Sequence, residues 1–178
     1  DLDQTPQVGY VTPSGLRYFD FKVGTGDKPK WGDWVEVDYA LYTITPAGDA
    51  LVMADTTFNS SDRSLILHHG NGEAILGIEE ALHSMRQGGR RRVIIPPTMA
   101  FATPGLLPYP LKDRQRRKFF QAMNDTGGTV VADLEILQIM PFPDEHGYYS
   151  DPTPSPEELK EIFTKAYQEN LAQSQSFP

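Results

Sequence analysis

The sequence predicts one α+β domain that carries an inserted helix and an acidic, partly helical tail. Residues 34–42 (WVEVDYALY) alternate partly in polarity and are rich in aromatic and β-branched side chains, which is typical of a β-strand. Residues 75–85 place apolar side chains three or four positions apart, which predicts a short amphipathic helix. The 178 residues suffice for one core plus appendages, because single domains usually have about 100–150 residues.

Other strands are expected on both sides of this helix, separated by turns that contain glycine, proline, asparagine or aspartate. A polar arm with two prolines comes first, at residues 1–13. The expected strands cover residues 16–23, 34–42, 51–54, 64–67, 92–95 and 129–139. The helix is expected to stop at Gly88, because glycine is common just past a helix end.

A long insertion separates the last two expected strands. Its first part, residues 102–110 (ATPGLLPYP), is too rich in proline for regular structure. Its second part, residues 111–124 (LKDRQRRKFFQAMN), predicts a basic helix. The expected organisation is an extended arm at 1–13, a domain at 14–140 with the insertion at 102–128, and a tail at 141–178.

The tail differs in composition from the domain. Seven acidic residues against two lysines give residues 141–178 a net charge of −5. Ser155-Pro156-Glu157-Glu158 predicts a helix start with a capping serine, a proline at the first position and a glutamate at the third. The apolar face of this helix can dock on its own domain or on a partner, and it includes Leu159, Ile162, Phe163 and Tyr167.

Composition excludes several classes of function. The formal net charge of −8 argues against nucleic acid as the main partner, because phosphate binding requires a basic surface. The absence of cysteine excludes disulfides, thiolate metal sites and cysteine nucleophiles. No apolar run approaches the roughly 20 residues of a membrane-spanning helix. The protein is therefore not expected to span a membrane itself.

Familiar catalytic motifs are also missing. The glycine-rich turn at residues 70–77 lacks the Lys-Ser/Thr of a phosphate-binding loop, and no Gly-x-Ser-x-Gly occurs. His68 and His69 are neighbours on an expected strand, so their side chains point to opposite faces and cannot share a metal. We therefore expect no metal and no cofactor.

Several charged runs have a simple structural interpretation. Glu79 and Glu80 are expected to form a solvated face near the start of the helix, where acidic side chains are favoured. Residues 90–92 (RRR) and the basic helix are expected to be solubilising. Because their charge is opposite to that of the tail, they are also candidates for a contact with the tail or with an acidic partner.

Six short motifs resemble, in type and order, those of the FKBP-type peptidyl-prolyl cis-trans isomerases. The resemblance covers about residues 13–140. It rests on Ser14-Gly15-Leu16, Gly24-Thr25-Gly26, Gly32-Asp33 before Val35-Glu36-Val37-Asp38-Tyr39, Asp55-Thr56-Thr57-Phe58, residues 70–85, and Val93-Ile94-Ile95-Pro96-Pro97. It implies a bent antiparallel sheet wrapped around one short helix.

The resemblance also implies a reaction and a site. The family catalyses rotation about X-Pro bonds, which faces a barrier of roughly 18–20 kcal/mol and requires no nucleophile or metal. An apolar pocket and one backbone N–H donor, here that of Ile75, would favour the twisted amide. Tyr39 and Asp55 match the pocket tyrosine and aspartate, whereas Phe101 replaces a second tyrosine and lacks its hydroxyl.

The expected pocket walls depart from the family pattern. Aromatic positions are occupied by Ala54, Leu65 and Ala132, and Ile78 replaces the usual tryptophan floor, while Ala74 lies beside the donor. These replacements predict weak or absent isomerase activity. The opposite expectation is that Tyr39, Asp55 and the Ile75 donor sustain catalysis, with a larger side chain from the insertion refilling the space.

The insertion and the Ser-Gly-Leu opening resemble FKBP-type immunophilins of the thylakoid lumen, although periplasmic bacterial members share the opening. The resemblance implies a binding, assembly or accessory subunit of a photosynthetic membrane complex. The alternatives are an active isomerase and folding chaperone for proline-containing chains, in the thylakoid lumen or a bacterial periplasm, and a free scaffold. The expected partner contacts are Arg114, Arg116, Arg117 and Lys118, with the apolar face of the tail helix.

Overall fold

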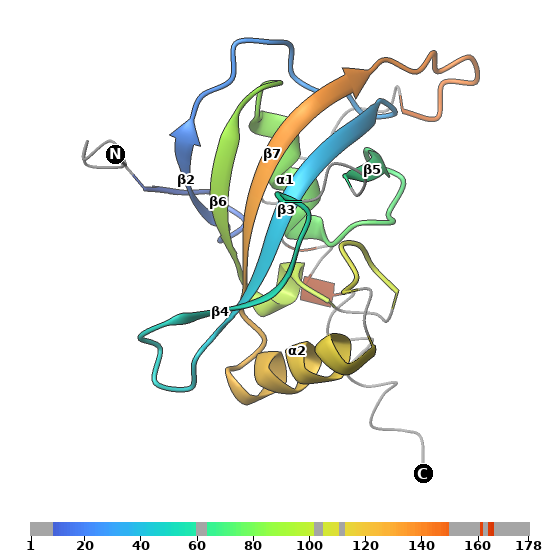
Figure 1. The fold of residues 1–178 in the computed structure, drawn as a ribbon. Coiled ribbons are helices and arrows are strands. Elements are labelled where there is room, and N and C mark those ends of the chain that lie inside the picture. Colours follow the sequence, from blue (N-terminus) through green and yellow to red (C-terminus); the bar gives the residue numbers. More distant parts are fainter. Residues whose placement is uncertain are drawn as a thin grey trace.

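The computed structural model describes residues 9–59, 64–101, 105–110, 113–149, 161 and 164–165. These form one antiparallel sheet, two α-helices and a 3₁₀ turn (Figure 1). The elements are β1 Tyr10–Val11, β2 Arg17–Lys22, β3 Trp34–Ile44, β4 Leu51–Thr56, β5 Leu65–His68, α1 Leu76–Ser84, β6 Arg90–Ile95, η1 Pro97–Met99, α2 Asp113–Asp125 and β7 Val130–Met140.

The sheet is ordered β1-β2-β6-β7-β3-β4, and β5 pairs with the other end of β3. The two long strands β3 and β7 pair along almost their whole length, from Trp34 opposite Met140 to Thr43 opposite Val130. Buried and partly exposed positions alternate along the first half of β3, which confirms the strand expected from its sequence pattern. The sheet curves over α1, which lies against one of its faces (Figure 1).

Helix α1 packs very closely on β6 because a glycine faces the sheet. A Cβ added at Gly77 would lie 2.4 Å from a side-chain carbon of Ile95, so no larger residue fits there without movement. The same helix buries Ile78 and Leu82 in the core. The hydroxyl of Ser14 donates to the carboxylate of Glu80 at 2.6 and 2.8 Å, which ties the chain before β2 to this helix.

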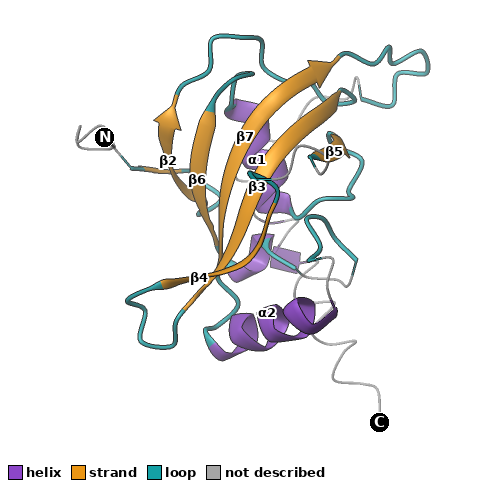
Figure 2. Cartoon of the chain, in the orientation of Figure 1, coloured by secondary structure: helices purple, strands orange, loops and turns teal. Residues whose placement is uncertain are grey.

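The insertion helix α2 is part of the domain rather than a separate appendage. Figure 2 shows it crossing beyond one end of the sheet, near β4, and it contacts both β3 and β4. Phe119 and Met123 belong to the central hydrophobic cluster, 2% and 8% exposed, although the helix as a whole is strongly polar. The two buried positions are four residues apart and therefore lie on one face.

Most expected elements are confirmed, with small shifts at their ends. The central helix begins at Leu76, because Ile75 has extended backbone angles and serves as its N-cap. Residues 10–11 of the expected arm form β1, which pairs with β2. In the tail, residues 161, 164 and 165 are helical. The tail positions expected to contact partners lie outside the described residues: Leu159, Ile162, Phe163 and Tyr167.

Two expectations about charged residues are wrong. Glu79 is only 6% exposed and accepts hydrogen bonds within the protein, so Glu79 and Glu80 do not form a shared solvated face. Arg91 is 4% exposed and forms a bidentate pair with Asp20, at 2.6 and 3.0 Å. Its guanidinium also donates to the carbonyl of Ala81 in the last turn of α1. Strand alternation explains this, because it turns the middle arginine of the run toward the helix.

Candidate functional site

The pairing of β3 with β4 brings Tyr39 and Asp55 together. The strands pair antiparallel, with Leu41 opposite Asp55, which places the two side chains within reach. The hydroxyl of Tyr39 donates to Oδ2 of Asp55 at 2.9 Å, and the tyrosine is 4% exposed. The hydroxyl of Thr57 accepts from the backbone N–H of Tyr39 at 2.9 Å, so this corner is held by several hydrogen bonds.

The start of α1 forms the second part of the site, and the insertion meets it there. The backbone N–H of Ile75 donates to the carbonyl of Leu107 at 2.9 Å. The N–H of Leu107 in turn donates to the carbonyl of Glu73 at 2.8 Å. Ala74 and Leu107 thereby form a parallel β-bridge between the glycine-rich turn and the insertion. The peptide bond between Leu107 and Pro108 is cis.

The remaining expected pocket residues gather around the same core. Ala74, Ile78 and Ala132 are at most 2% exposed and belong to the central hydrophobic cluster, as does Tyr39. Ala54 and Leu65 are partly buried and pack against that cluster. These expected residues therefore belong to or pack against one hydrophobic core, to which α2 adds Phe119 and Met123.

Phe101 contacts the insertion helix through its ring. It makes edge-to-face contacts with Phe119 and Phe120, with ring centroids 5.4 and 5.3 Å apart. Such aromatic pairs add about 0.5–1.5 kcal/mol each beyond the area they bury. The ring of Phe101 thus helps to dock α2 on the domain.

The basic residues of α2 differ in exposure. Arg114, Arg117 and Lys118 are exposed. Arg117 and Lys118 lie three and four residues after Arg114, so the three side chains form one basic face of the helix. Arg116 is partly buried, with its guanidinium 4.6 Å from the centre of the Tyr109 ring, within the range of a cation–π contact. Of the four side chains expected to contact a partner, Arg114, Arg117 and Lys118 therefore share this open face, whereas Arg116 does not.

A second cluster lies on the other side of α1 and was not expected. Nδ1 of His69 donates to Oε2 of Glu79, and Nε2 of His69 lies 3.1 Å from Nδ1 of His83. The Trp31 ring stacks on both imidazoles, with centroids 4.3 and 4.2 Å apart. The tight fit involves Gly70, where an added Cβ would lie 2.6 Å from the Trp31 ring. No pattern in the sequence indicates this cluster, because its members come from three separate segments.

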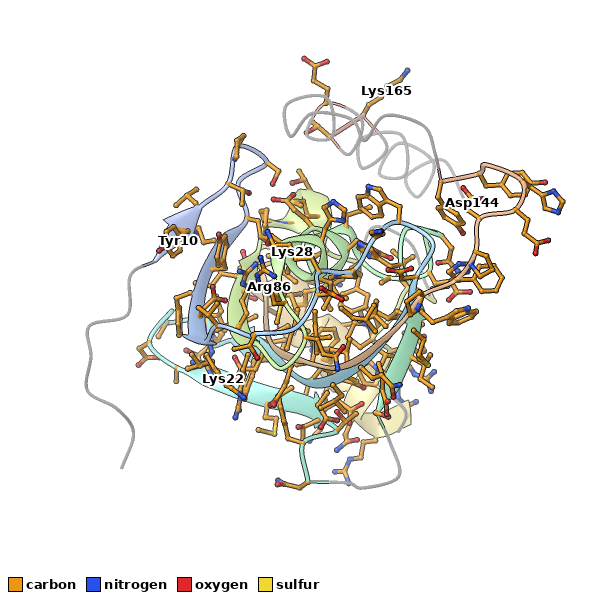
Figure 3. All side chains as sticks on the ribbon, turned by 90° about the horizontal axis from the view of Figure 1, so that it is seen from above. Tyr10, Lys22, Lys28, Arg86, Asp144 and Lys165 are labelled. Carbon is orange, nitrogen blue, oxygen red and sulfur yellow. The ribbon has the colours of Figure 1, made fainter. Side chains whose placement is uncertain are left out.

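Burial lowers the pKa of His83 below its ordinary value, and the nearby His69 and Lys28 lower it further, against an opposing effect of Glu79. His83 also lines an open pocket of about 950 Å³ together with Lys28 and Arg86, which lie near one another in Figure 3. Among the described residues, no group of three or more histidine, aspartate or glutamate side chains is arranged to hold a metal ion. Within that same part of the chain, no helix is long and apolar enough to cross a membrane.

Comparison with known sequences identifies the protein family that has this fold. Residues 25–119 match the FKBP-type peptidyl-prolyl cis-trans isomerase family, and the chain belongs to that family. Curated relatives include the Arabidopsis thaliana chloroplastic isomerases FKBP19, 33% identical over 73% of this chain, and FKBP16-3, 36% identical over 64%. The chain spans 55% and 47% of the lengths of these two relatives.

Solved structures support the fold. FkpA from Escherichia coli matches with a TM-score of 0.54 and 24% identity, over 76% of this chain and 53% of that one. AtFKBP13 matches with a TM-score of 0.52 and 23% identity, over 74% of this chain and 98% of that one. Both confirm the α+β architecture expected from the sequence, a bent antiparallel sheet around a central helix.

Proposed function

We propose that this FKBP-family protein turns over X-Pro peptides only weakly and acts mainly by binding other proteins. The observation that carries the proposal is that the insertion packs against the candidate site: Leu107 accepts the hydrogen bond of the Ile75 amide, and Phe119 belongs to the same hydrophobic cluster as Ile78. The backbone donor that a substrate would use is thus engaged within the chain.

The composition of the pocket walls supports the same conclusion. Aromatic side chains bury about 150–250 Å² each, and Ala54, Leu65 and Ala132 offer much less contact. If each lost aromatic group withdraws about 1 kcal/mol of transition-state stabilisation, three losses lower the rate more than a hundredfold. The small walls alone would then leave a poor catalyst.

A second candidate function is supported by one observation. Tyr39 and Asp55 form a hydrogen bond of 2.9 Å, and they are the polar side chains that match the pattern of the family pocket. An active isomerase or folding chaperone for proline-containing chains, in the thylakoid lumen or in a bacterial periplasm, would use this arrangement. We regard it as the alternative because the donor and the walls are altered.

The protein-binding role would use the surface of the insertion and the tail. The exposed basic face of α2, formed by Arg114, Arg117 and Lys118, suits an acidic partner surface. The chloroplastic relatives support a place in the chloroplast, and we propose the thylakoid lumen, with a photosynthetic membrane complex as the partner. The apolar face of the tail helix would contribute the remaining contacts.

Two experiments test the two halves of this proposal. A protease-coupled assay with an X-Pro peptide measures turnover, with an FKBP-type isomerase of established activity as the reference; comparable turnover would refute the weak-catalyst half. Deletion of residues 150–178, which leaves all the packing of residues 141–149 in place, should preserve the folded domain by circular dichroism. The deletion should also remove the protein from a large complex on a native gel, and unchanged co-migration would refute the role of the tail.

A further inference from the structure

One segment of the insertion makes the hydrogen bonds of a bound peptide strand. Leu107 accepts from the N–H of Ile75 and donates to the carbonyl of Glu73, so both backbone groups of one residue pair with the glycine-rich turn. This is the parallel pairing by which an added strand is held at an exposed backbone edge. The segment Gly105–Pro110, with sequence GLLPYP, thus lies where an external chain would lie.

Side-chain contacts hold this segment against the domain. Leu106 and Leu107 pack on the central hydrophobic cluster, and Pro108 and Pro110 are buried. The ring of Tyr109 contacts Phe120, with centroids 5.9 Å apart, and the guanidinium of Arg116. The segment is therefore fixed by α2 on one side and by the start of α1 on the other.

The single N–H group of Ile75 can donate one strong hydrogen bond at a time. A substrate carbonyl that uses this donor must first displace the carbonyl of Leu107. Because the competing carbonyl belongs to the same chain, its effective concentration exceeds that of a free peptide at ordinary levels. The apparent affinity for an external peptide is then reduced by the fraction of molecules in which the segment has left the site.

We propose that Gly105–Pro110 is a built-in ligand of the proline site, which closes the site until a proline-containing chain displaces it. This inference rests on the proposed function, because it assigns the Ile75 amide the role of substrate donor. It adds that the low activity has a reversible component, separate from the loss of the aromatic walls. A free peptide with the sequence of this segment, GLLPYP, is therefore the probe for displacement.

Hydrogen exchange at two amides distinguishes displacement from other modes of binding. In the free protein the N–H groups of Ile75 and Leu107 should both exchange slowly, because both donate backbone hydrogen bonds. With saturating GLLPYP peptide, the Leu107 amide of the protein should lose protection, while Ile75 stays protected because the peptide carbonyl replaces that of Leu107. Peptide binding with both amides still protected would overturn the proposal, since the peptide would then lie elsewhere.

A variant with a weakened segment gives an independent test. Leu107→Ala removes part of a partly buried side chain and keeps the backbone, so it should raise the apparent peptide affinity about tenfold. Val23→Ala, at an exposed loop position, is the matched control and should leave the affinity unchanged. Equal affinity of Leu107→Ala and wild type, or no binding to either at millimolar peptide, would overturn the proposal.

These outcomes separate the inference from the proposed function. Wild-type turnover close to that of the reference isomerase would refute the weak catalyst, whatever the exchange pattern. Low wild-type turnover with a protected Leu107 amide in the peptide complex would keep the weak catalyst and refute the built-in ligand.

Discussion

The amide nitrogen of Ile75 lies 2.9 Å from the carbonyl oxygen of Leu107 and donates a hydrogen bond to it. This contact links the first turn of α1 to an insertion that begins about 30 residues later along the chain. It makes the insertion part of the candidate site.

Phe119 should be the main anchor of the insertion helix. It is 2% exposed and contacts Phe101 and Phe120 edge to face. Phe119→Ala should lower the free energy of unfolding by about 3–5 kcal/mol, the usual cost of such a truncation in a core. Urea denaturation measures this, with the exposed Gln121→Ala as a control expected within about 0.5 kcal/mol of wild type. A loss below about 1 kcal/mol would show that α2 is only loosely attached.

The outer face of the sheet depends on a buried carboxylate. Asp133 is 2% exposed and forms a bidentate pair with Arg92, at 2.6 and 2.8 Å. Arg92→Met leaves this carboxylate without its cation, and we expect a loss of about 2–4 kcal/mol in the free energy of unfolding, because Arg92 is itself partly exposed. Adding Asp133→Asn should recover part of the loss. A single variant as stable as wild type would contradict this account.

The lowered pKa of His83 should make folding sensitive to acid. The unfolded chain binds a proton to this histidine near pH 6.5, whereas the folded protein does so only at lower pH. The contribution is therefore fully present above pH 6.5 and is lost as the pH falls from there toward the folded pKa.

The variant His83→Gln isolates this effect. It keeps hydrogen-bonding groups beside His69 and does not titrate, so the Tm of wild type minus that of the variant should be larger at pH 7.5 than at pH 5.5. Differential scanning calorimetry at the two pH values supplies the measurement. A difference that stays constant or grows at low pH would mean that His83 does not gain its proton more easily on unfolding.

The basic face of α2 should bind a partner without stabilising the domain. Reversing the charge of Arg114 and Arg117 together should abolish co-migration with a large complex and shift the Tm by little, because both side chains are exposed. Lys22→Glu, at an exposed position of β2, is the control for net charge and should retain the complex. Loss of the complex in this control as well would indicate general electrostatic attraction instead of a defined surface.

The strands and the central helix were accessible from the sequence because each has its own periodic pattern. The alternation in β3 and the three-or-four spacing in α1 both follow from local geometry, and both segments have the expected type. The candidate site residues, such as Tyr39 and Ile75, were predicted from the order of the motifs. The two-residue strand β1 was not recognisable, since two residues carry no periodicity.

Contacts that join distant segments were not accessible in this way. Nothing in the letters LLPYP shows that the carbonyl of Leu107 reaches the amide of Ile75, because that contact depends on how α2 docks. Glu79 was expected to be solvated beside Glu80, and its hydrogen bonds with His69 and with the N–H of Gly70 explain its burial. The charge pattern along a helix does not predict which side chains are buried when their hydrogen-bond partners come from a distant segment.

The most direct test of weak catalysis is the rate at which the intact protein isomerises an X-Pro peptide in a protease-coupled assay. We expect a kcat/KM at least about a hundredfold below that of the reference isomerase measured in parallel, because about three aromatic contacts in the transition state are missing. A kcat/KM within a few fold of the reference would contradict weak catalysis and would favour an active isomerase that uses Tyr39, Asp55 and the Ile75 amide.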